Sequence, residues 1–166
     1  MNKLKIKKMK TVDIPSCARV IRKGFYTVAN EFHLTIDNCK TNGAFIKSNK
    51  LLQEKIKGTE FFYLSYKMKK IGFIGIKQVD SKAYEIQKIT ILPKYRHNGF
   101  GAILLNYAIK YAENRNAEFI NVNIINENLK LKQWYLKNGF KFLYTEKFDT
   151  LPFIVGYMSY KIEKDN

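Results

Sequence analysis

Cysteine is scarce in this chain of 166 residues, and long apolar segments are absent. The two cysteines, Cys17 and Cys39, match no metal-binding spacing, so the sequence excludes a disulfide-rich scaffold and predicts no metal site. The densest apolar segment, residues 71–76, is as short as a strand. No secretory signal is visible at the N-terminus. We therefore expect a cytoplasmic protein with reduced cysteines and no membrane partner.

Acidic side chains are also scarce, with 14 Asp+Glu against 30 Lys+Arg and a net charge of +16. Such an excess is typical of proteins that contact nucleic acid or the ribosome. Arginine, which supplies most base-edge and bidentate phosphate contacts, is rare here, and the lysines are spread along the chain. We favour a solvated basic surface that also attracts an anionic ligand, with nucleic-acid or ribosome binding as the alternative.

Hydrophobic periodicity indicates an α/β protein of the α+β kind, and the length fits one domain over residues 1–166. Asp13 is expected to cap the first helix, and Gly58 to end the second. The order of elements predicts a mixed sheet with helices on both faces. Helices are predicted at 14–28, 44–57, 100–114 and 129–137, and strands at 3–9, 61–66, 71–79, 84–91, 119–124, 140–148 and 154–162.

A strand that ends before a glycine-containing turn and a helix is the most informative segment of the chain. Pro93 stops the β-forming residues, and Gly99 and Gly101 open the next helix. The first N–H groups of a helix have no partner inside it, and glycine lets a ligand approach the backbone closely. Leu104 replaces the third glycine of a dinucleotide fingerprint, and no P-loop is present. The segment therefore predicts a phosphate site, with a purely structural turn as the alternative.

Two linked motifs identify the chain as similar to the GNAT superfamily of N-acetyltransferases. The segment Arg96-x-x-Gly99-x-Gly101 matches the superfamily's Q/R-x-x-G-x-G/A signature, and Ile91-x-Pro93 matches the V-x-P that ends its fourth strand. A downstream element resembles N-x-x-A-x-x-L-Y-x-x-x-G-F, and it reads Asn128-x-x-Leu131-x-x-Trp134-Tyr135-x-x-x-Gly139-Phe140. Leu131 departs from the usual small residue, which affects helix packing or the approach of the cofactor. His97-Asn98 departs from the commoner Gly-Lys or Gly-Arg, without affecting backbone contacts.

The resemblance implies a mixed, mostly antiparallel sheet of six or seven strands, about four flanking helices, and acetyl-CoA as cofactor. The strands 84–91 and 119–124 would splay apart to admit it. The backbone of Ile89 and Ile91 would pair with the pantetheine arm, and an N–H near Ile91 would polarise the thioester carbonyl. Asn128 would bond the pantetheine or diphosphate region, or serve as a helix N-cap, and the two roles are compatible. The pyrophosphate would be held by the backbone of Arg96, His97, Asn98, Gly99, Phe100, Gly101 and Ala102.

Acetylation of an amine needs a base, because an ammonium has no lone pair, and an acid to protonate the leaving thiolate. The resemblance places Tyr135 where such enzymes keep the acid, and its alternative role is that of a core aromatic residue. Glu85 stands eleven residues before Arg96, where several members of the family keep a glutamate base. Its alternative is an ordinary carboxylate at the start of a strand. A water chain, or His33 after the first helix, is the other candidate base.

The acceptor side is predicted to involve Tyr26, Glu31 and Phe32, together with the 149–153 loop. Phe25 belongs more readily to the core, and Glu31 is either a cation-binding or a merely solvated carboxylate. No cysteine is placed to carry an acetyl group, so direct transfer in a ternary complex is expected. The acceptor is a small amine or a protein N-terminus or lysine, and the net charge disfavours polyamines unless the pocket is locally acidic. A homodimer is possible through an edge at strand 154–162.

Overall fold

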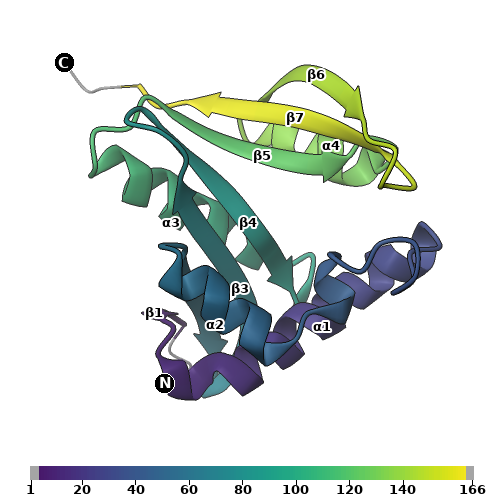
Figure 1. Cartoon of the computed structure of the whole chain (residues 1–166). Helices are drawn as coiled ribbons and strands as arrows, with labels where there is room; N and C mark the ends of the chain where they lie inside the picture. The colour runs from purple at the N-terminus through teal and green to yellow at the C-terminus, as the bar shows by residue number, and fades with distance from the viewer. Residues whose placement is uncertain (1–3, 164–166) are drawn as a thin grey trace.

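The computed structural model describes residues 4–163 and shows one mixed sheet of seven strands (Figure 1). The strand order is β1-β2-β3-β4-β5-β7-β6, and every neighbouring pair is antiparallel except β4 and β5. This confirms the predicted fold class. The strands are β1 (Lys5–Lys8), β2 (Glu60–Tyr66), β3 (Lys69–Gln78), β4 (Ala83–Ile91), β5 (Phe119–Ile125), β6 (Lys141–Lys147) and β7 (Ile154–Lys161).

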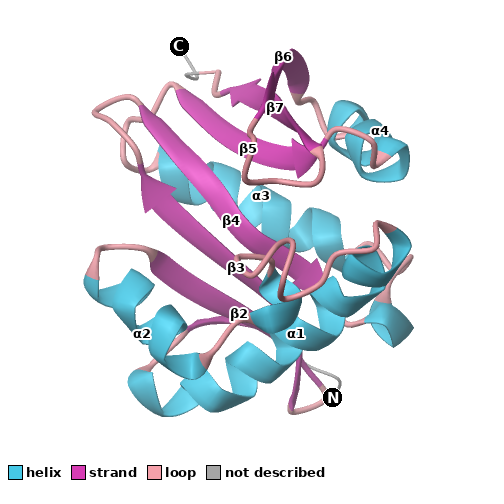
Figure 2. Cartoon of the chain, turned by 45° about the vertical axis from the view of Figure 1, so that its right-hand side comes forward, coloured by secondary structure: helices cyan, strands magenta, loops and turns pink. Residues whose placement is uncertain are grey.

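Helices cover both faces of the sheet (Figure 2). On one face lie α1 (Ile14–Glu31) and α2 (Ser48–Ile56), and on the other α3 (Phe100–Glu113) and α4 (Leu129–Lys137). Alternation along β2 shows why both faces are apolar, because Phe61 packs with α1 residues and Phe62 packs with α3 residues. Three short 3₁₀ turns are η1 (Thr11–Asp13), η2 (Gly43–Phe45) and η3 (Pro93–Tyr95). No described helix is both long and apolar enough to cross a membrane.

The segment predicted as one helix at 44–57 is instead divided into η2 and α2. Ile46 between them is extended and buried, and its carbonyl oxygen accepts a hydrogen bond of 2.9 Å from Arg22 Nη1 on α1. The gain from burying this side chain against α1 outweighs continuing the helix. Gly58 follows the end of α2 with a φ of +97°, as predicted for a glycine at this position.

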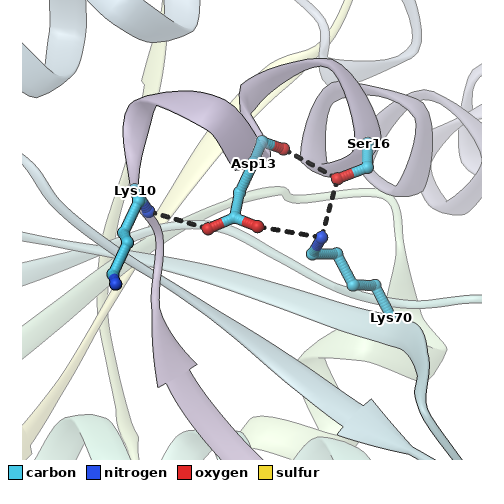
Figure 3. A network of polar contacts seen from close by, with 4 residues as sticks. All are labelled: Lys10, Asp13, Ser16 and Lys70. Carbon is cyan, nitrogen blue, oxygen red and sulfur yellow. Dashed lines mark hydrogen bonds and ion pairs between the residues drawn. The ribbon is translucent and has the colours of Figure 1, made fainter.

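The start of α1 is fastened to the sheet by a network of polar contacts (Figure 3). Asp13 precedes α1 as predicted, but its side chain caps no N–H of that helix. Its carboxylate instead accepts from the Lys10 N–H at 2.9 Å and lies 3.0 Å from Lys70 Nζ on β3. Lys70 also donates to Ser16 Oγ at 2.9 Å. The Asp13–Lys70 ion pair and the Lys70–Ser16 hydrogen bond thus join the start of α1 to β3.

The parallel strands β4 and β5 separate soon after they begin. They pair only at Ala83–Phe119, Tyr84–Ile120 and Glu85–Asn121. A β-bulge then interrupts β4, where Lys88 has a φ of +53° and the pairing with β3 shifts between Phe73 and Gly75. The two strands therefore diverge toward their carboxyl ends, as the family resemblance implies.

The prediction that strand 154–162 presents a free edge is wrong. β7 lies between β5 and β6 and pairs with both. The edges of the sheet are β1 and β6. The hydrophobic pattern alone does not predict which strand of the β6–β7 hairpin lies next to β5, because either strand could pair with it.

Candidate functional site

The loop between β4 and α3 presents a row of backbone N–H groups at the open end of the split. Gly99 precedes α3 with a left-handed φ of +76°, and His97 has a φ of +61°. Across the described residues 4–163, no protein atom accepts a hydrogen bond from the N–H groups of residues 97–102. The Arg96 N–H, in contrast, donates to the Pro93 carbonyl at 3.2 Å. The free row thus starts one residue later than predicted.

The two glycines of the loop serve different purposes. A Cβ on Gly99 would meet no atom within 4 Å, so the space above this residue is open beside the free amides. A Cβ on Gly101 would lie 3.2 Å from Trp134 Cζ2, so glycine there allows α3 to approach α4. An anion can therefore reach the amides at Gly99, and the positive end of the α3 dipole favours it.

The Arg96 side chain joins this loop to α1. Its guanidinium donates to the Ile91 carbonyl at 3.0 Å, to Thr27 Oγ1 at 2.9 Å and to the Gly24 carbonyl at 2.7 Å. Burial lowers the pKa of Arg96 from its ordinary value, which leaves it protonated at neutral pH. The arginine of the motif thus positions the loop. Sequence reasoning missed Thr27 and Gly24, which accept these hydrogen bonds. No local pattern on α1 indicated a partner 69 or 72 residues away in the sequence.

Tyr135 and Asn128, both predicted from the downstream motif, are buried in or beside α4. Tyr135 is 1% exposed and its ring lies 4.9 Å from that of Trp134 and 5.1 Å from that of Phe140. Burial raises the pKa of Tyr135 well above its ordinary value, so the phenol stays protonated. Asn128 Oδ1 accepts from the Leu131 N–H at 3.1 Å, which confirms the helix N-cap. The proton-donor role of Tyr135 and the cofactor role of Asn128 stay predictions.

Glu85 lies where the pairing of β4 with β5 stops, at the base of the split. Its carboxylate is partly exposed and accepts from Gln87 Nε2 at 3.0 Å. Ile89 and Ile91 lie further along β4, past the bulge and beyond the last β5 partner. The predicted base and the predicted pantetheine strand are therefore on the same element, with Glu85 deeper in the split.

The predicted acceptor residues fall in two different places. Tyr26 is 64% exposed and lines a hollow of about 530 Å³ between α1 and η3. Phe32 instead packs in a small cluster with the 149–153 loop and Ile125 at the end of β5. Glu31 is exposed at the last residue of α1. The hollow is lined by Arg22, Lys23, Tyr26, Thr27, Ala44, Leu92, Pro93 and Lys94.

The two remaining candidates, Phe25 on α1 and His33 after it, are explained by local structure. Phe25 packs against the core between α1 and the sheet, which confirms its reading as a core residue. His33 follows α1 with a φ of +53°, and its carbonyl accepts from Asn38 Nδ2 at 3.0 Å. Its role as a base stays a prediction.

Sequence reasoning missed a polar group on β6 and β7. Tyr157 lies opposite Asn123 of β5 and opposite Tyr144 of β6, on the same face of the sheet as Glu85. Its hydroxyl donates to Glu146 Oε2 at 3.0 Å. Figure 1 shows α1 and α2 over the β1–β4 half of this face, with β5, β7 and β6 uncovered. Strand alternation predicted which residues share a face, but the neighbouring order of β7 and β6 was needed to place them.

Residues 29–140 of the chain match the acetyltransferase (GNAT) family. The fold is similar to that of ribosomal-protein-S18-alanine N-acetyltransferase from Escherichia coli, with a TM-score of 0.77, 15% identity, and coverage of 99% of this chain and 97% of that one. A GNAT acetyltransferase from Elizabethkingia anophelis with acetyl-CoA bound matches at a TM-score of 0.68 and 14% identity, covering 97% and 99% of the two chains. PaiA N-acetyltransferase from Thermoplasma acidophilum, in complex with coenzyme A, matches at a TM-score of 0.74 and 19% identity, covering 96% and 99%.

No curated protein is significantly similar to this chain in sequence. The family match nevertheless extends over more than half of the 166 residues and includes β4, the free amides of the following loop and β5. The chain therefore belongs to the acetyltransferase (GNAT) family.

Proposed function

We propose that this enzyme transfers an acetyl group directly from acetyl-CoA to a primary amine within a ternary complex. The observation that carries the proposal is the row of free N–H groups at residues 97–102, beside a split between two parallel strands. A diphosphate needs several donors and positive potential, and the start of α3 supplies both. The open space above Gly99 leaves room for it.

The pantetheine arm is proposed to follow β4 toward Glu85. Past the bulge at Lys88, the strand has lost its β5 partner, so one edge of its backbone is available to an added extended chain. Ile89 and Ile91 are the residues we assign to this pairing. An N–H in this stretch would polarise the thioester carbonyl, which gains negative charge as the amine attacks.

The proton transfers are assigned to Glu85 and Tyr135. Glu85, directly or through water, takes a proton from the ammonium so that its nitrogen can attack the acetyl carbon. The new C–N bond forms, the C–S bond breaks, and the thiolate takes the phenolic proton of Tyr135. The nitrogen then loses its second proton, which returns through water to the Tyr135 phenolate. Tyr135 is a protonated phenol at neutral pH, as a proton donor must be, and its burial also makes it a weaker acid than an exposed tyrosine.

Direct transfer is supported by where the cysteines lie. Cys17 is 0% exposed in the core between α1 and the sheet, and Cys39 is 5% exposed in the cluster near the end of α1. Burial raises the pKa of Cys17 to about 12, so its thiol is a poor nucleophile at neutral pH. Two reduced, buried thiols also support our assignment of the enzyme to the cytoplasm.

The proposal is tested by two measurements on the purified protein. Calorimetry should detect binding of acetyl-CoA, and release of free thiol should depend on added amine. An enzyme that binds acetyl-CoA without releasing thiol with any of a panel of small amines and peptides would contradict amine acetylation.

The net charge of +16 supports a second candidate, a protein on this fold that binds nucleic acid or the ribosome. Binding to RNA with an affinity that falls steeply with salt, together with no amine-dependent thiol release, would favour it. A homodimer formed through a sheet edge would use β1 or β6 rather than β7.

A further inference from the structure

An ion pair joins helix α2 to the bulge in β4. Lys88 Nζ lies 2.6 Å from Glu54 Oε2, and the two side chains are only 17% and 20% exposed. Glu54 Oε2 is buried and has no hydrogen-bond partner of regular geometry among residues 4–163, so the Lys88 ammonium is the group that compensates its charge. Because a mostly buried charge is costly without its partner, the pair holds α2 against the bulge.

Lys88 is the extra residue of this bulge. The pairing of β3 with β4 leaves Lys88 and Ile89 opposite the single residue Ile74. Lys88 has a left-handed φ of +53°, a conformation that favours glycine and that glycine usually adopts in such a bulge. A lysine is strained there, and the ion pair with Glu54 is the contact that offsets the strain.

The extra residue resets which side chains of β4 face α3. Before the bulge, Tyr84 and Ile86 belong to the core on that face, and after it Ile89 and Ile91 pack there. The interval between Ile86 and Ile89 is thus three residues, whereas alternate residues of a regular strand share a face. Without the bulge, Ile89 and Ile91 would turn to the opposite face of the sheet.

The bulge also decides which N–H groups of β4 reach the split. The Leu92 N–H, directly after β4, donates to the Ile71 carbonyl of β3 at 2.8 Å. Successive residues of a strand direct their backbone groups to opposite edges, so Ile91 and Ile89 direct theirs away from β3, toward the split. At the start of β4 the order is the reverse, because the Ala83 carbonyl accepts, at 3.0 Å, from the N–H of the residue after β3. Odd-numbered residues therefore face β3 before the bulge and the split after it.

On the basis of the proposed function, we propose that Glu54 and Lys88 are positioning residues for the acetyl donor. Their ion pair holds Lys88 in the left-handed conformation. The bulge then keeps the N–H groups of Ile89 and Ile91 at the split, where the pantetheine arm is assigned. Without the ion pair, β4 would exchange between this register and a regular one in which those N–H groups point to β3. The pair thus acts on the donor through the backbone of β4.

The test measures amide hydrogen exchange by NMR, with and without saturating acetyl-CoA. In the wild type, acetyl-CoA should slow exchange at Ile89 and Ile91 about tenfold or more. Glu54→Gln should reduce this protection several-fold and retain the protection of residues 97–102, whereas a merely structural role would change both together. Glu60→Gln on β2 is the matched control, since it removes a more exposed ion pair with Lys8 and should keep the protection at both places.

Two substitutions of Lys88 separate the backbone from the charge. Lys88→Gly removes the strain together with the ion pair, so the bulge should persist and Ile89 and Ile91 should stay protected. Lys88→Met keeps the strain without the ion pair and should lose protection as Glu54→Gln does. Equal losses in the two Lys88 variants would show that the lysine charge acts on the donor directly, which overturns positioning through the backbone.

The outcomes separate positioning from donor binding. If acetyl-CoA protects Ile89 and Ile91 in Glu54→Gln as well as in the wild type, the proposal is overturned while donor binding stands. If acetyl-CoA protects neither residues 97–102 nor β4 in the wild type, the proposed function fails instead. The free protein then still decides. Faster exchange of the Leu92 N–H in Glu54→Gln than in Glu60→Gln supports the hold of the ion pair on the bulge, and equal exchange overturns it.

Discussion

At the scale of single residues, the loop before α3 shows how one motif assigns different roles to similar side chains. Gly99 has a left-handed backbone and open space above it, whereas Gly101 lies against Trp134. Arg96 has its guanidinium directed at α1, although the motif places it next to the proposed phosphate site. We thus propose that the backbone N–H groups of the loop bind acetyl-CoA, and that the Arg96 side chain holds the loop in place.

Gly99→Glu should abolish acetyl-CoA binding. The new carboxylate would project into the open space beside the free amides, where its charge and bulk oppose the diphosphate. The positive φ adds a backbone cost of about 1 kcal/mol, which leaves the fold largely intact. Calorimetry measures the affinity. Gly99→Ala is the matched control, because it shares the backbone cost without the charge and should retain measurable binding. Unchanged affinity in Gly99→Glu would reject this location for the diphosphate.

Tyr135→Phe should lower kcat with little change in the affinity for acetyl-CoA. Phenylalanine preserves the packing against Trp134 and Phe140, and only the proposed proton donor is removed. General acid catalysis typically contributes about 10²–10⁴ in rate. Stopped-flow transfer rates and calorimetry separate the two quantities. A variant with the wild-type rate would show that Tyr135 is a core aromatic residue only.

At the scale of elements, the site depends on contacts between segments far apart in sequence. Arg96 joins the loop after β4 to α1, and Asp13 with Lys70 joins the start of α1 to β3. The pairing of β4 with β5 ends at Glu85, and the bulge at Lys88 follows it. Helix α1 therefore sets the position of the loop from one side, and the sheet sets it from the other.

Arg96→Lys should weaken acetyl-CoA binding although the charge is kept. A lysine ammonium cannot reach Ile91, Thr27 and Gly24 together as the planar guanidinium does. Loss of one or two such bonds costs on the order of 1–3 kcal/mol in the free energy of unfolding. Thermal denaturation and calorimetry should both respond. Arg115→Lys is the control, since Arg115 is exposed, follows α3 and its guanidinium donates to the carbonyl of Tyr111 on that helix. Equal acetyl-CoA affinity in the two variants would show that the contacts of Arg96 with α1 do not hold the loop in its binding position.

The Asp13 network should make stability depend on pH at the acidic end. Burial raises the pKa of Asp13, but the Lys10 N–H and the Lys70 ammonium more than offset this, and the net pKa lies below its ordinary value. The contribution of its charged form is therefore present above about pH 4 and is lost as the pH falls through the folded-state pKa. Asp13→Asn should lower Tm at pH 7, by the equivalent of about 1 kcal/mol, and the difference should shrink below pH 4. A difference that stays constant with pH would contradict the ion pair.

At the scale of the whole molecule, the charge of +16 supplies long-range attraction for an anionic donor. Raising the ionic strength should therefore weaken acetyl-CoA binding several-fold without changing the midpoint of thermal unfolding much. Titrations at increasing potassium chloride measure this. An affinity that does not depend on salt would show that only the local amides and dipole attract the diphosphate.

The sequence by itself determined the class of fold and the family, and it marked the loop that we propose binds the diphosphate. Helix and strand periodicities, Pro93, and the spacing of Gly99 and Gly101 are local properties of the chain, and they need no partner to be recognised. Only the tertiary structure decided that Arg96 faces α1, that residues 44–57 form two elements, and that β7 lies inside the sheet. It also brought Tyr144, Tyr157 and Glu146 onto the face that carries Glu85. These facts depend on strand order and on burial against distant segments. Each contact joins two segments that are far apart in the sequence, so neither segment alone predicts it.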